Sequence, residues 1–257
     1  MTKLKICGLM NALDIRLCAA SGADILGFVT NYPVPVPWGL TKDQTKELLA
    51  CVPRTVESCL VTGGKVEKIL SLAAQLRPDY VQLHYKESFA ETRVLAEALL
   101  TYGIKTIKAV PVREDGSCDM TEFSTVTAAI TALARTKIAA VLIDSRCATA
   151  PASRSRQLDP ALCRNLVQIS QKPLFLSGGI TGDNLSLILK EAAPFGVDIL
   201  TGTEDAPGQK SKEKIEKICR SIHGSHYRSF TNVNGSPVNP STENCEPKES
   251  LGSSKSV

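Results

Sequence analysis

The chain has 257 residues, 43% of them hydrophobic, and a formal net charge of +4. This length suits one large α/β domain and provides enough chain for a sizeable core. The mild charge is spread along the chain and aromatic residues make up only 5% of it, which argues against a surface for nucleic acid or an acidic membrane but leaves a site for a small anion open.

Short apolar runs rich in β-branched residues alternate with longer segments of helical period through residue 222. The apolar runs predict eight strands, at 4–7, 25–29, 56–61, 80–83, 105–110, 139–144, 174–177 and 197–201. The segments between them carry apolar residues three and four positions apart and predict helices at 11–21, 42–51, 65–76, 89–102, 121–135, 160–169, 183–193 and 211–222. This alternation is typical of a parallel sheet.

Eight consecutive βα units are what a closed barrel requires, so the predicted fold class is α/β, a single (βα)8 TIM barrel over residues 1–222. A doubly wound open sheet would also alternate in this way, but the sequence lacks the GxGxxG turn expected near its start. From residue 223 the chain is rich in Ser, Asn, Pro and Gly, a composition that buries too little apolar surface to offset its ordering entropy. Residues 223–257 are therefore predicted to be a disordered C-terminal tail.

The nine cysteines form neither a CxxC pair nor the spacing of a zinc site, and their number is odd. We therefore expect no metal site and no disulfide framework. The N-terminus begins with strand-like sequence rather than a signal peptide, and no apolar run approaches the length needed to cross a bilayer. These features predict a cytoplasmic protein without a membrane partner.

Functional side chains of a βα barrel gather at the carboxyl ends of its strands. Cys7 ends the first predicted strand and Asp144 the sixth, three steps apart around a closed ring; Gln82 and Asp198 belong to other strand ends. Cys7 and Asp144 would then face each other across the mouth, which suits a base and an acid acting on two sides of one small substrate. A nearby cation would favour the Cys7 thiolate, although a small buried hydrophobe is the alternative interpretation.

Charged and polar residues near the rim have less definite interpretations. Lys5 shares the face of Cys7, because side chains alternate along a strand, but its position one layer lower favours a buried ion pair at the barrel floor. His84 either orients a substrate or makes a structural hydrogen bond. Only the periodicity of the strands places Lys108 and Glu204 at the rim, and we expect both side chains to be solvated.

Two glycine-containing loops follow the seventh and eighth predicted strands. The run LFLSGGITGDN places Gly178 and Gly179 between a strand and a helix, and GVDILTGTED places Gly202 after the next strand. Glycines there let backbone N–H groups approach an anion, and many barrels bind a phosphate between these two loops. Although such glycines can also serve only as tight turns, the pair of loops favours a phosphorylated small-molecule substrate.

Seven segments, in the same order along the chain, resemble those of the phosphoribosylanthranilate isomerase family, whose members are single-barrel enzymes of tryptophan biosynthesis. The segments are KICGL, SGADILGFV, YVQLH, IKAV, AAVLIDS, LFLSGGITGDNL and PFGVDILTGTEDAPGQKSKEKI, and they run from about residue 4 to residue 222. The resemblance implies an isomerase that acts on a phosphorylated small molecule, and we expect a monomer or a homodimer.

The reaction that this resemblance implies is the Amadori rearrangement of N-(5-phosphoribosyl)anthranilate, with Cys7 as general base and Asp144 as general acid. Asp144 would protonate the ribose ring oxygen and open the ring to an iminium, and Cys7 would take the proton from C2′. The iminium acidifies that proton, so neither a metal nor an organic cofactor is implied. The resemblance places substrate contacts at Gly178, Gly179, Gly202 and Asp198, to which we add His84 and the hydroxyl of Thr201.

Three features of the family are altered. Its Ser-Pro-Arg element after strand two, whose arginine meets the anthranilate carboxylate, is replaced by NYPVPVPWGLT, and its GGTG turn after strand six by RCATAPASRSRQLD. The serine pair before the last glycine is replaced by Leu200 and Thr201, of which the threonine keeps a hydroxyl. Arg154 or Arg156 could replace the missing carboxylate contact. Two alternatives therefore stay open: an isomerase for a different phosphorylated ligand, and a non-catalytic binding barrel.

Overall fold

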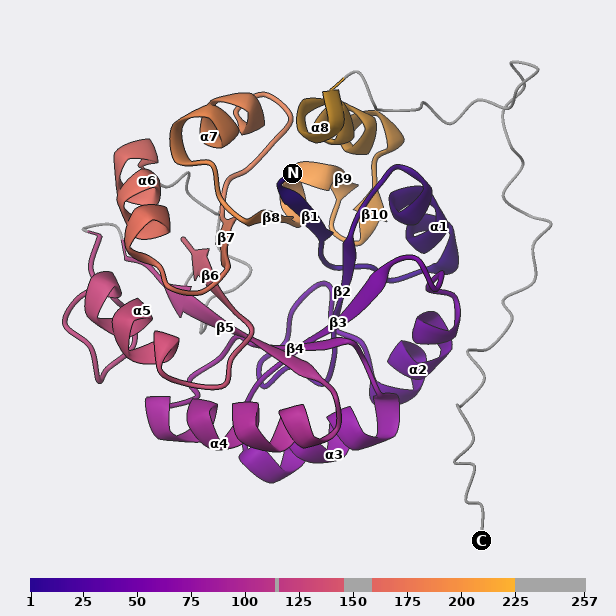
Figure 1. The fold of residues 1–257 in the computed structure, drawn as a ribbon. Helices are drawn as coiled ribbons and strands as arrows, with labels where there is room; N and C mark the ends of the chain where they lie inside the picture. The colour runs from indigo at the N-terminus through magenta and orange to yellow at the C-terminus, as the bar shows by residue number, and fades with distance from the viewer. Residues whose placement is uncertain (114–115, 146–158, 225–257) are drawn as a thin grey trace, which may run out of the picture.

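The computed structural model describes residues 1–113, 116–145 and 159–224 (Figure 1). Within these residues, consecutive parallel strands pair with one another and β8 pairs with β1, so that β1 to β8 close into a barrel. The strands are β1 (Lys3–Ile6), β2 (Ile25–Val29), β3 (Glu57–Thr62), β4 (Tyr80–Leu83), β5 (Lys105–Pro111), β6 (Ala140–Asp144), β7 (Leu174–Ser177) and β8 (Gly196–Ile199). The predicted (βα)8 barrel is confirmed.

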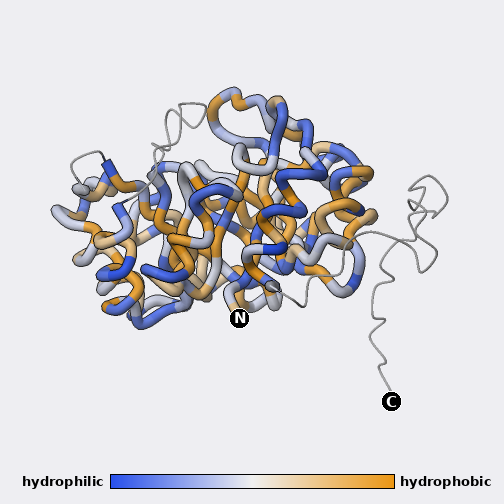
Figure 2. Tube along the Cα trace, turned by 90° about the horizontal axis from the view of Figure 1, so that it is seen from above, coloured by the Kyte–Doolittle hydropathy of each residue, from blue (hydrophilic) through white to orange (hydrophobic). Residues whose placement is uncertain are grey.

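Helices surround the barrel and connect its consecutive strands (Figure 1). They are α1 (Ala12–Ala20), α2 (Lys42–Ala50), α3 (Val66–Leu76), α4 (Phe89–Thr101), α5 (Val126–Ala134), α6 (Pro160–Ile169), α7 (Leu185–Ala192) and α8 (Lys212–His223). Thr41 and Ser88 form capping boxes that start α2 and α4. Hydrophilic and hydrophobic residues alternate along the helices (Figure 2), as expected of helices with one apolar stripe.

Alternation of side chains along the strands separates two apolar layers. In β3, Cys59 and Val61 belong to the cluster inside the barrel, whereas Leu60 belongs to the cluster between the strands and the outer helices. The interior also contains Lys5 and Lys108, both fully buried. A buried ammonium group is costly unless it is paired, so the partners of these two lysines define the interior around the site.

The segment after β8 differs from its prediction. β8 ends at Ile199 rather than at residue 201, because the chain turns into a short 3-10 helix, η1 (Thr201–Thr203). An antiparallel hairpin follows, formed by β9 (Glu204–Ala206) and β10 (Gln209–Lys210), which simple βα alternation does not predict. Gly208, at a φ of 78°, lies in the turn between the two strands, where a left-handed conformation favours glycine.

Two helix limits also differ from their predictions. Helix α5 begins at Val126 rather than at residue 121, because the Thr125 side chain accepts a hydrogen bond from the backbone of Ala128 and caps the helix there. Helix α8 continues to His223, one residue beyond the predicted boundary of the barrel.

Some predictions lie outside the described residues. These include the tail from residue 225 to residue 257 and the loop at 146–158, which contains Arg154 and Arg156. In the part of the chain that the structure covers, no helix is long and apolar enough to cross a membrane. The same residues contain no cluster of three His, Cys, Asp or Glu side chains arranged to hold a metal ion.

Candidate active site

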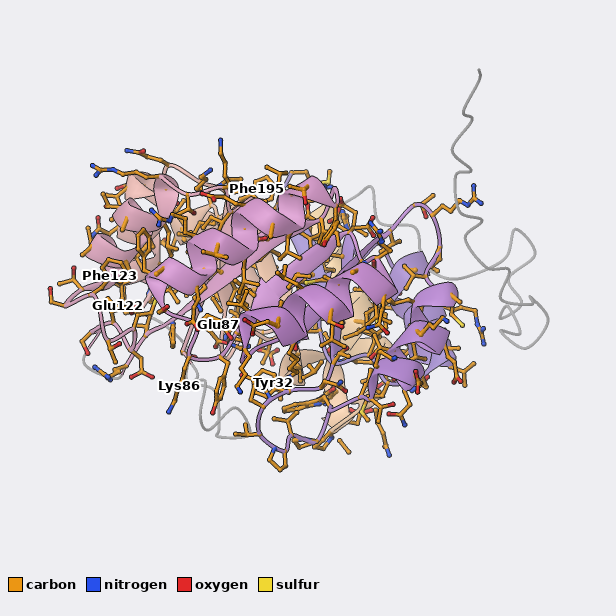
Figure 3. The ribbon with its side chains drawn as sticks, turned by 90° about the horizontal axis from the view of Figure 1, so that it is seen from below. Tyr32, Lys86, Glu87, Glu122, Phe123 and Phe195 are labelled. Atoms are coloured by element: carbon orange, nitrogen blue, oxygen red, sulfur yellow. The ribbon has the colours of Figure 1, made fainter. Side chains whose placement is uncertain are left out.

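A cavity opens at the carboxyl end of the barrel. Tyr32 and Lys86 lie at this end of the molecule, and Phe195, directly before β8, lies at the other (Figure 3). The cavity and its open mouth together hold about 480 Å3 of space between protein atoms. Its described lining comes from seven strands or the residues directly after them and from the β2–α2 loop: Cys7, Val29, Tyr32, Val36, Trp38, Val61, Gln82, His84, Asp144, Ser177, Asp198 and Leu200.

Cys7 directly follows β1 and is held there by a hydrogen bond of 3.0 Å from its backbone N–H to the carbonyl of Ile199. The thiol occupies space that Gly27 leaves free, because a Cβ at position 27 would stand 2.8 Å from the Cys7 Sγ. Burial raises the pKa of the Cys7 thiol, and the ammonium group of Lys5 opposes that rise. Lys5 therefore favours the thiolate as expected, but burial has the larger effect.

Lys5 and Asp198 form a buried ion pair beneath Cys7, with 2.9 Å between Nζ and Oδ2. This confirms the predicted ion pair at the barrel floor. Burial opposes the charge on Lys5, but the carboxylate of Asp198 and the thiols of Cys7 and Cys59 together outweigh burial and raise the Lys5 pKa. Asp198 also lines the cavity, and its other carboxylate oxygen, Oδ1, has no hydrogen-bond partner among the described residues.

Asp144 ends β6 and lies near His84, which follows β4. The Nε2 atom of His84 is 3.1 Å from Oδ2 of Asp144, at an ion-pair distance although not in hydrogen-bond geometry. Tyr32 donates its hydroxyl to the backbone carbonyl of His84, which fixes the β4–α4 connection against the β2–α2 loop. His84 is therefore oriented toward the carboxylate, and the structure places both residues in the same cavity as Cys7.

Three buried polar atoms of residues that line the cavity lack hydrogen-bond partners among the described residues. They are Oε1 of Gln82, Nε2 of His84 and Oδ1 of Asp198. Buried polar groups in proteins are nearly always hydrogen-bonded, so such atoms on one wall indicate a polar ligand that completes them. Two are acceptors, and a ligand with hydroxyl groups would complete those two.

The predicted phosphate residues lie next to the cavity lining rather than in it. Gly178 and Gly179 follow Ser177, and Thr201 and Gly202 follow Leu200. A Cβ at Gly178 would stand 2.0 Å from Oγ of Ser145, and one at Gly202 would stand 2.0 Å from the carbonyl oxygen of Ile180. Close loop packing thus requires these two glycines, and their contact with a phosphate stays a prediction.

The β2–α2 loop forms an apolar wall where the family has an arginine. Tyr32, Val36 and Trp38 line the cavity there, and none of its described lining residues is Lys or Arg. The Trp38 indole is buried, and its Nε1 lies 3.0 and 3.1 Å from the two carboxylate oxygens of Glu204. The replacement of the carboxylate contact by Arg154 or Arg156 falls outside the described residues and stays a prediction.

The expectation that Lys108 and Glu204 are solvated is wrong. Lys108 is 1% exposed and pairs with Glu87 at 3.0 Å, and Glu204 is 6% exposed and pairs with Lys210 at 2.9 Å. Periodicity assigns a face to a residue but does not show that a distant segment brings an opposite charge to it. Sequence reasoning missed Lys210 for this reason, although the Pro-Gly of APGQK is a turn signal that predicts a hairpin.

Comparison with known proteins gives a consistent result. A family model described as N-(5'phosphoribosyl)anthranilate (PRA) isomerase matches residues 4–221. N-(5'-phosphoribosyl)anthranilate isomerase of Azorhizobium caulinodans is 33% identical over 225 residues, covering 86% of this chain and 91% of the relative. The protein of that name from Methanosarcina acetivorans is 28% identical over 223 residues, with coverages of 86% and 93%.

Solved structures agree with the sequence matches. Phosphoribosyl anthranilate isomerase from Thermotoga maritima has a TM-score of 0.72 at 26% identity, covering 87% of this chain and 100% of that one. A phosphoribosyl anthranilate isomerase in complex with reduced 1-(o-carboxyphenylamino)-1-deoxyribulose 5-phosphate has a TM-score of 0.69, with the same identity and coverage.

Proposed function

The chain belongs to the N-(5'-phosphoribosyl)anthranilate isomerase family, and from this membership we propose how its cavity performs the family's reaction. The protein is an isomerase of L-tryptophan biosynthesis. It catalyses the Amadori rearrangement of N-(5-phosphoribosyl)anthranilate to 1-(2-carboxyphenylamino)-1-deoxyribulose 5-phosphate. These relatives do not favour the alternative of a different phosphorylated ligand.

Asp144 is the general acid in this proposal. Its carboxyl group donates a proton to the ribose ring oxygen, the C1′–O bond breaks, and the nitrogen lone pair forms an iminium with C1′. His84, with Nε2 at 3.1 Å from the carboxyl oxygen, is placed to orient the acid. The positive iminium then weakens the adjacent C2′–H bond.

Cys7 is the general base. Its thiolate takes the proton from C2′, and the electrons of that C–H bond form the C1′=C2′ double bond while the iminium nitrogen becomes neutral. The enolamine then gains a proton at C1′ as its C2′ hydroxyl becomes the ketone. Because burial raises the thiol pKa, we expect kcat/KM to rise with pH until the thiolate predominates.

The remaining residues of the cavity hold the substrate. Oε1 of Gln82 and Oδ1 of Asp198 accept hydrogen bonds from ribose hydroxyls, which supplies the partners that these buried atoms lack among the described residues. The aromatic ring of the substrate contacts the wall formed by Tyr32, Val36 and Trp38.

The phosphate end of the substrate lies, in this proposal, between the loops after β7 and β8. Gly178, Gly179 and Gly202 bring backbone N–H groups to the anion, and Thr201 adds its hydroxyl. Gly179 has a φ of 60°, a conformation that favours glycine and turns the backbone at the start of the loop.

One observation carries these assignments most directly: Cys7 and Asp144 line the same cavity from strands that are three steps apart in the closed barrel. A small substrate bound in this cavity would therefore lie between a thiol and a carboxyl group. A binding barrel without catalysis would not need that pair.

The test is a fluorescence assay with freshly prepared phosphoribosylanthranilate, whose anthranilate emission falls as it is converted. We expect turnover by the wild type and a loss of at least about 100-fold in kcat for Cys7→Ala and for Asp144→Asn. Cys51→Ala and Asp43→Asn are matched controls outside the cavity lining and should stay within about twofold of wild type. Absence of wild-type turnover would refute the function, and turnover that survives both cavity substitutions would refute the two roles.

A further inference from the structure

A buried lysine from the hairpin contacts the backbone of Cys7. The Lys210 side chain is fully buried, and its Nζ donates to the carbonyl oxygen of Cys7 at 2.6 Å. The same ammonium lies 3.4 Å from the carbonyl oxygen of Leu200 and 2.9 Å from Oε1 of Glu204. One cation thus joins the loop after β1, the end of β8 and the first strand of the hairpin, which lie together in Figure 1.

Glu204 extends this set of contacts to the apolar wall. Its carboxylate accepts from the indole Nε1 of Trp38 and, at 3.2 Å, from the backbone N–H of Gly208. Trp38 in turn packs on the residue after Cys7, since a Cβ at Gly8 would stand 3.0 Å from the indole Cδ1. The contacts therefore form a closed ring that starts and ends at the Cys7–Gly8 backbone.

We propose that Lys210 and Glu204 are positioning residues, which hold the Cys7 backbone and the Trp38 indole so that the thiol meets the substrate in one fixed place. This inference rests on the proposed role of Cys7 as general base. A displacement of about 1 Å at a reacting group can reduce a rate by about 100-fold, so a restraint on the backbone of the base has a catalytic consequence.

Stability alone does not account for a charged pair at this place. A buried ion pair is often no more stabilising than well-packed apolar residues of the same volume, because both charges lose their hydration. Hydrogen bonds from the Lys210 ammonium to carbonyl oxygens fix direction as well as distance, which an apolar side chain cannot do. The ammonium also acts on the thiol electrostatically, since its charge opposes the rise in the Cys7 pKa that burial causes.

The charges around the thiol come from several elements. Lys5 lowers the Cys7 pKa and Asp198 raises it, and their ion pair lies beneath the thiol. On the other side of Lys210, Asp14 of α1 accepts from the Lys210 backbone N–H at 3.3 Å. Among the residues that the structure describes, the other titratable groups that face Cys7 or Lys210 are Cys59 of β3, Cys18 of α1, Glu204 of β9 and, across the cavity, His84 and Asp144.

The experiment measures the pH dependence of Cys7 alkylation by iodoacetamide, with the Cys7-containing peptide quantified by mass spectrometry. Lys210→Met leaves the Glu204 charge without its partner, so the profile should move to higher pH by about half a unit or more. Glu204→Gln leaves the Lys210 charge without its partner and should move the profile to lower pH. A merely structural role would not move the two variants in opposite directions.

Steady-state kinetics supply the second readout. Lys210→Met should lower kcat by about tenfold or more with a smaller change in KM, because the base is displaced rather than the binding groups. Lys210→Arg keeps the charge and should restore the alkylation profile to that of the wild type while recovering part of kcat. Lys108→Met removes an equally buried cation from the β5 side of the barrel and should reduce stability without shifting the profile.

Thermal unfolding of each variant controls for loss of the fold. If Lys210→Met does not fold, the other two variants still test the proposal: the alkylation profile of Glu204→Gln should move to lower pH, and that of Lys210→Arg should match the wild type. Unshifted profiles, or shifts of both variants in the same direction, would contradict the proposal. Alkylation reports on the thiol and not on turnover, so a failure of the base assignment would appear in the Cys7→Ala assay instead.

Discussion

The two sides of the cavity mouth differ in how charge is arranged around the reacting groups. On the side of β1 and β8, Cys7 lies above the Lys5–Asp198 pair and beside the Lys210–Glu204 pair. On the side of β4 and β6, Nε2 of His84 lies 3.1 Å from Oδ2 of Asp144.

This difference matches the opposite needs of a base and an acid. A buried thiol loses its proton too reluctantly to act as a base, so cations beside it favour the form that reacts. A carboxylic acid must keep its proton until the ring oxygen takes it. In the proposed mechanism, the barrel thus places lysines near the thiol of the base and the imidazole of His84 beside the carboxyl group of the acid.

Removal of the cation at the barrel floor should have the largest effect. Lys5→Met leaves the Asp198 carboxylate buried without its described partner, which costs about 3–5 kcal/mol of unfolding free energy. The same change removes the nearest opposing charge from Cys7, so alkylation of the thiol should require higher pH. Denaturant unfolding measures the loss of stability, and the pH profile of alkylation measures the effect on the thiol. An unchanged alkylation profile would show that Lys5 does not affect the pKa of Cys7.

On the acid side, His84→Asn should lower kcat by about tenfold. The substitution removes the imidazole that lies 3.1 Å from the carboxyl group and is proposed to orient it, while the charged residues around Cys7 stay in place. The Cys7 alkylation profile should therefore match the wild type. A shift of that profile would show that the two sides of the mouth are not independent.

A smaller effect is expected at the predicted phosphate loops. Gly202→Ala places a Cβ 2.0 Å from the carbonyl oxygen of Ile180, which forces the backbone to move and should raise KM by about three- to tenfold. Inorganic phosphate should stabilise the wild type in a thermal shift assay and stabilise Gly202→Ala less. Gly103→Ala is the control for backbone strain away from these loops: its φ of 75° disfavours alanine although a Cβ there has no described atom within 4 Å, so it should lower stability and leave KM unchanged.

The smallest effect should come from an ion pair on the surface. Lys105 and Glu57 are 2.6 Å apart, but their side chains are 47% and 38% exposed. Lys105→Gln should therefore change the unfolding free energy by at most about 1 kcal/mol. A loss of unfolding free energy as large as that of Lys5→Met would show that burial does not explain the different contributions of the two lysines to stability.

The sequence predicted the architecture well because strand and helix periods are local properties. Short apolar runs predicted that β6 ends at Asp144 and that Cys7 ends the first strand, one residue beyond the observed end of β1, and both residues line the cavity. The buried ion pair of Lys5 at the barrel floor was also predictable, because the alternation of side chains along a strand places this lysine one layer below the rim. These predictions require only the chain near each residue.

The missed features depend on contacts between distant segments. Lys210 lies 203 positions from Cys7 in the chain, and no local pattern links the two. For Lys108 and Glu204, exposure was the default for a charged residue, and it fails where a partner such as Glu87 arrives from another loop. The hairpin that carries Lys210 interrupts the βα alternation on which the prediction of the barrel was based.

Gly27 has a further consequence for the use of this barrel as a scaffold. A Cβ at position 27 would stand 2.8 Å from the Cys7 thiol and 3.1 Å from the Lys5 ammonium, so even a methyl group there displaces both. Libraries that aim at new substrates should keep this position invariant and vary the wall at Tyr32 and Val36 instead. Conversely, we expect Gly27→Ala to lower kcat by displacing the thiol while every proposed catalytic side chain is still present.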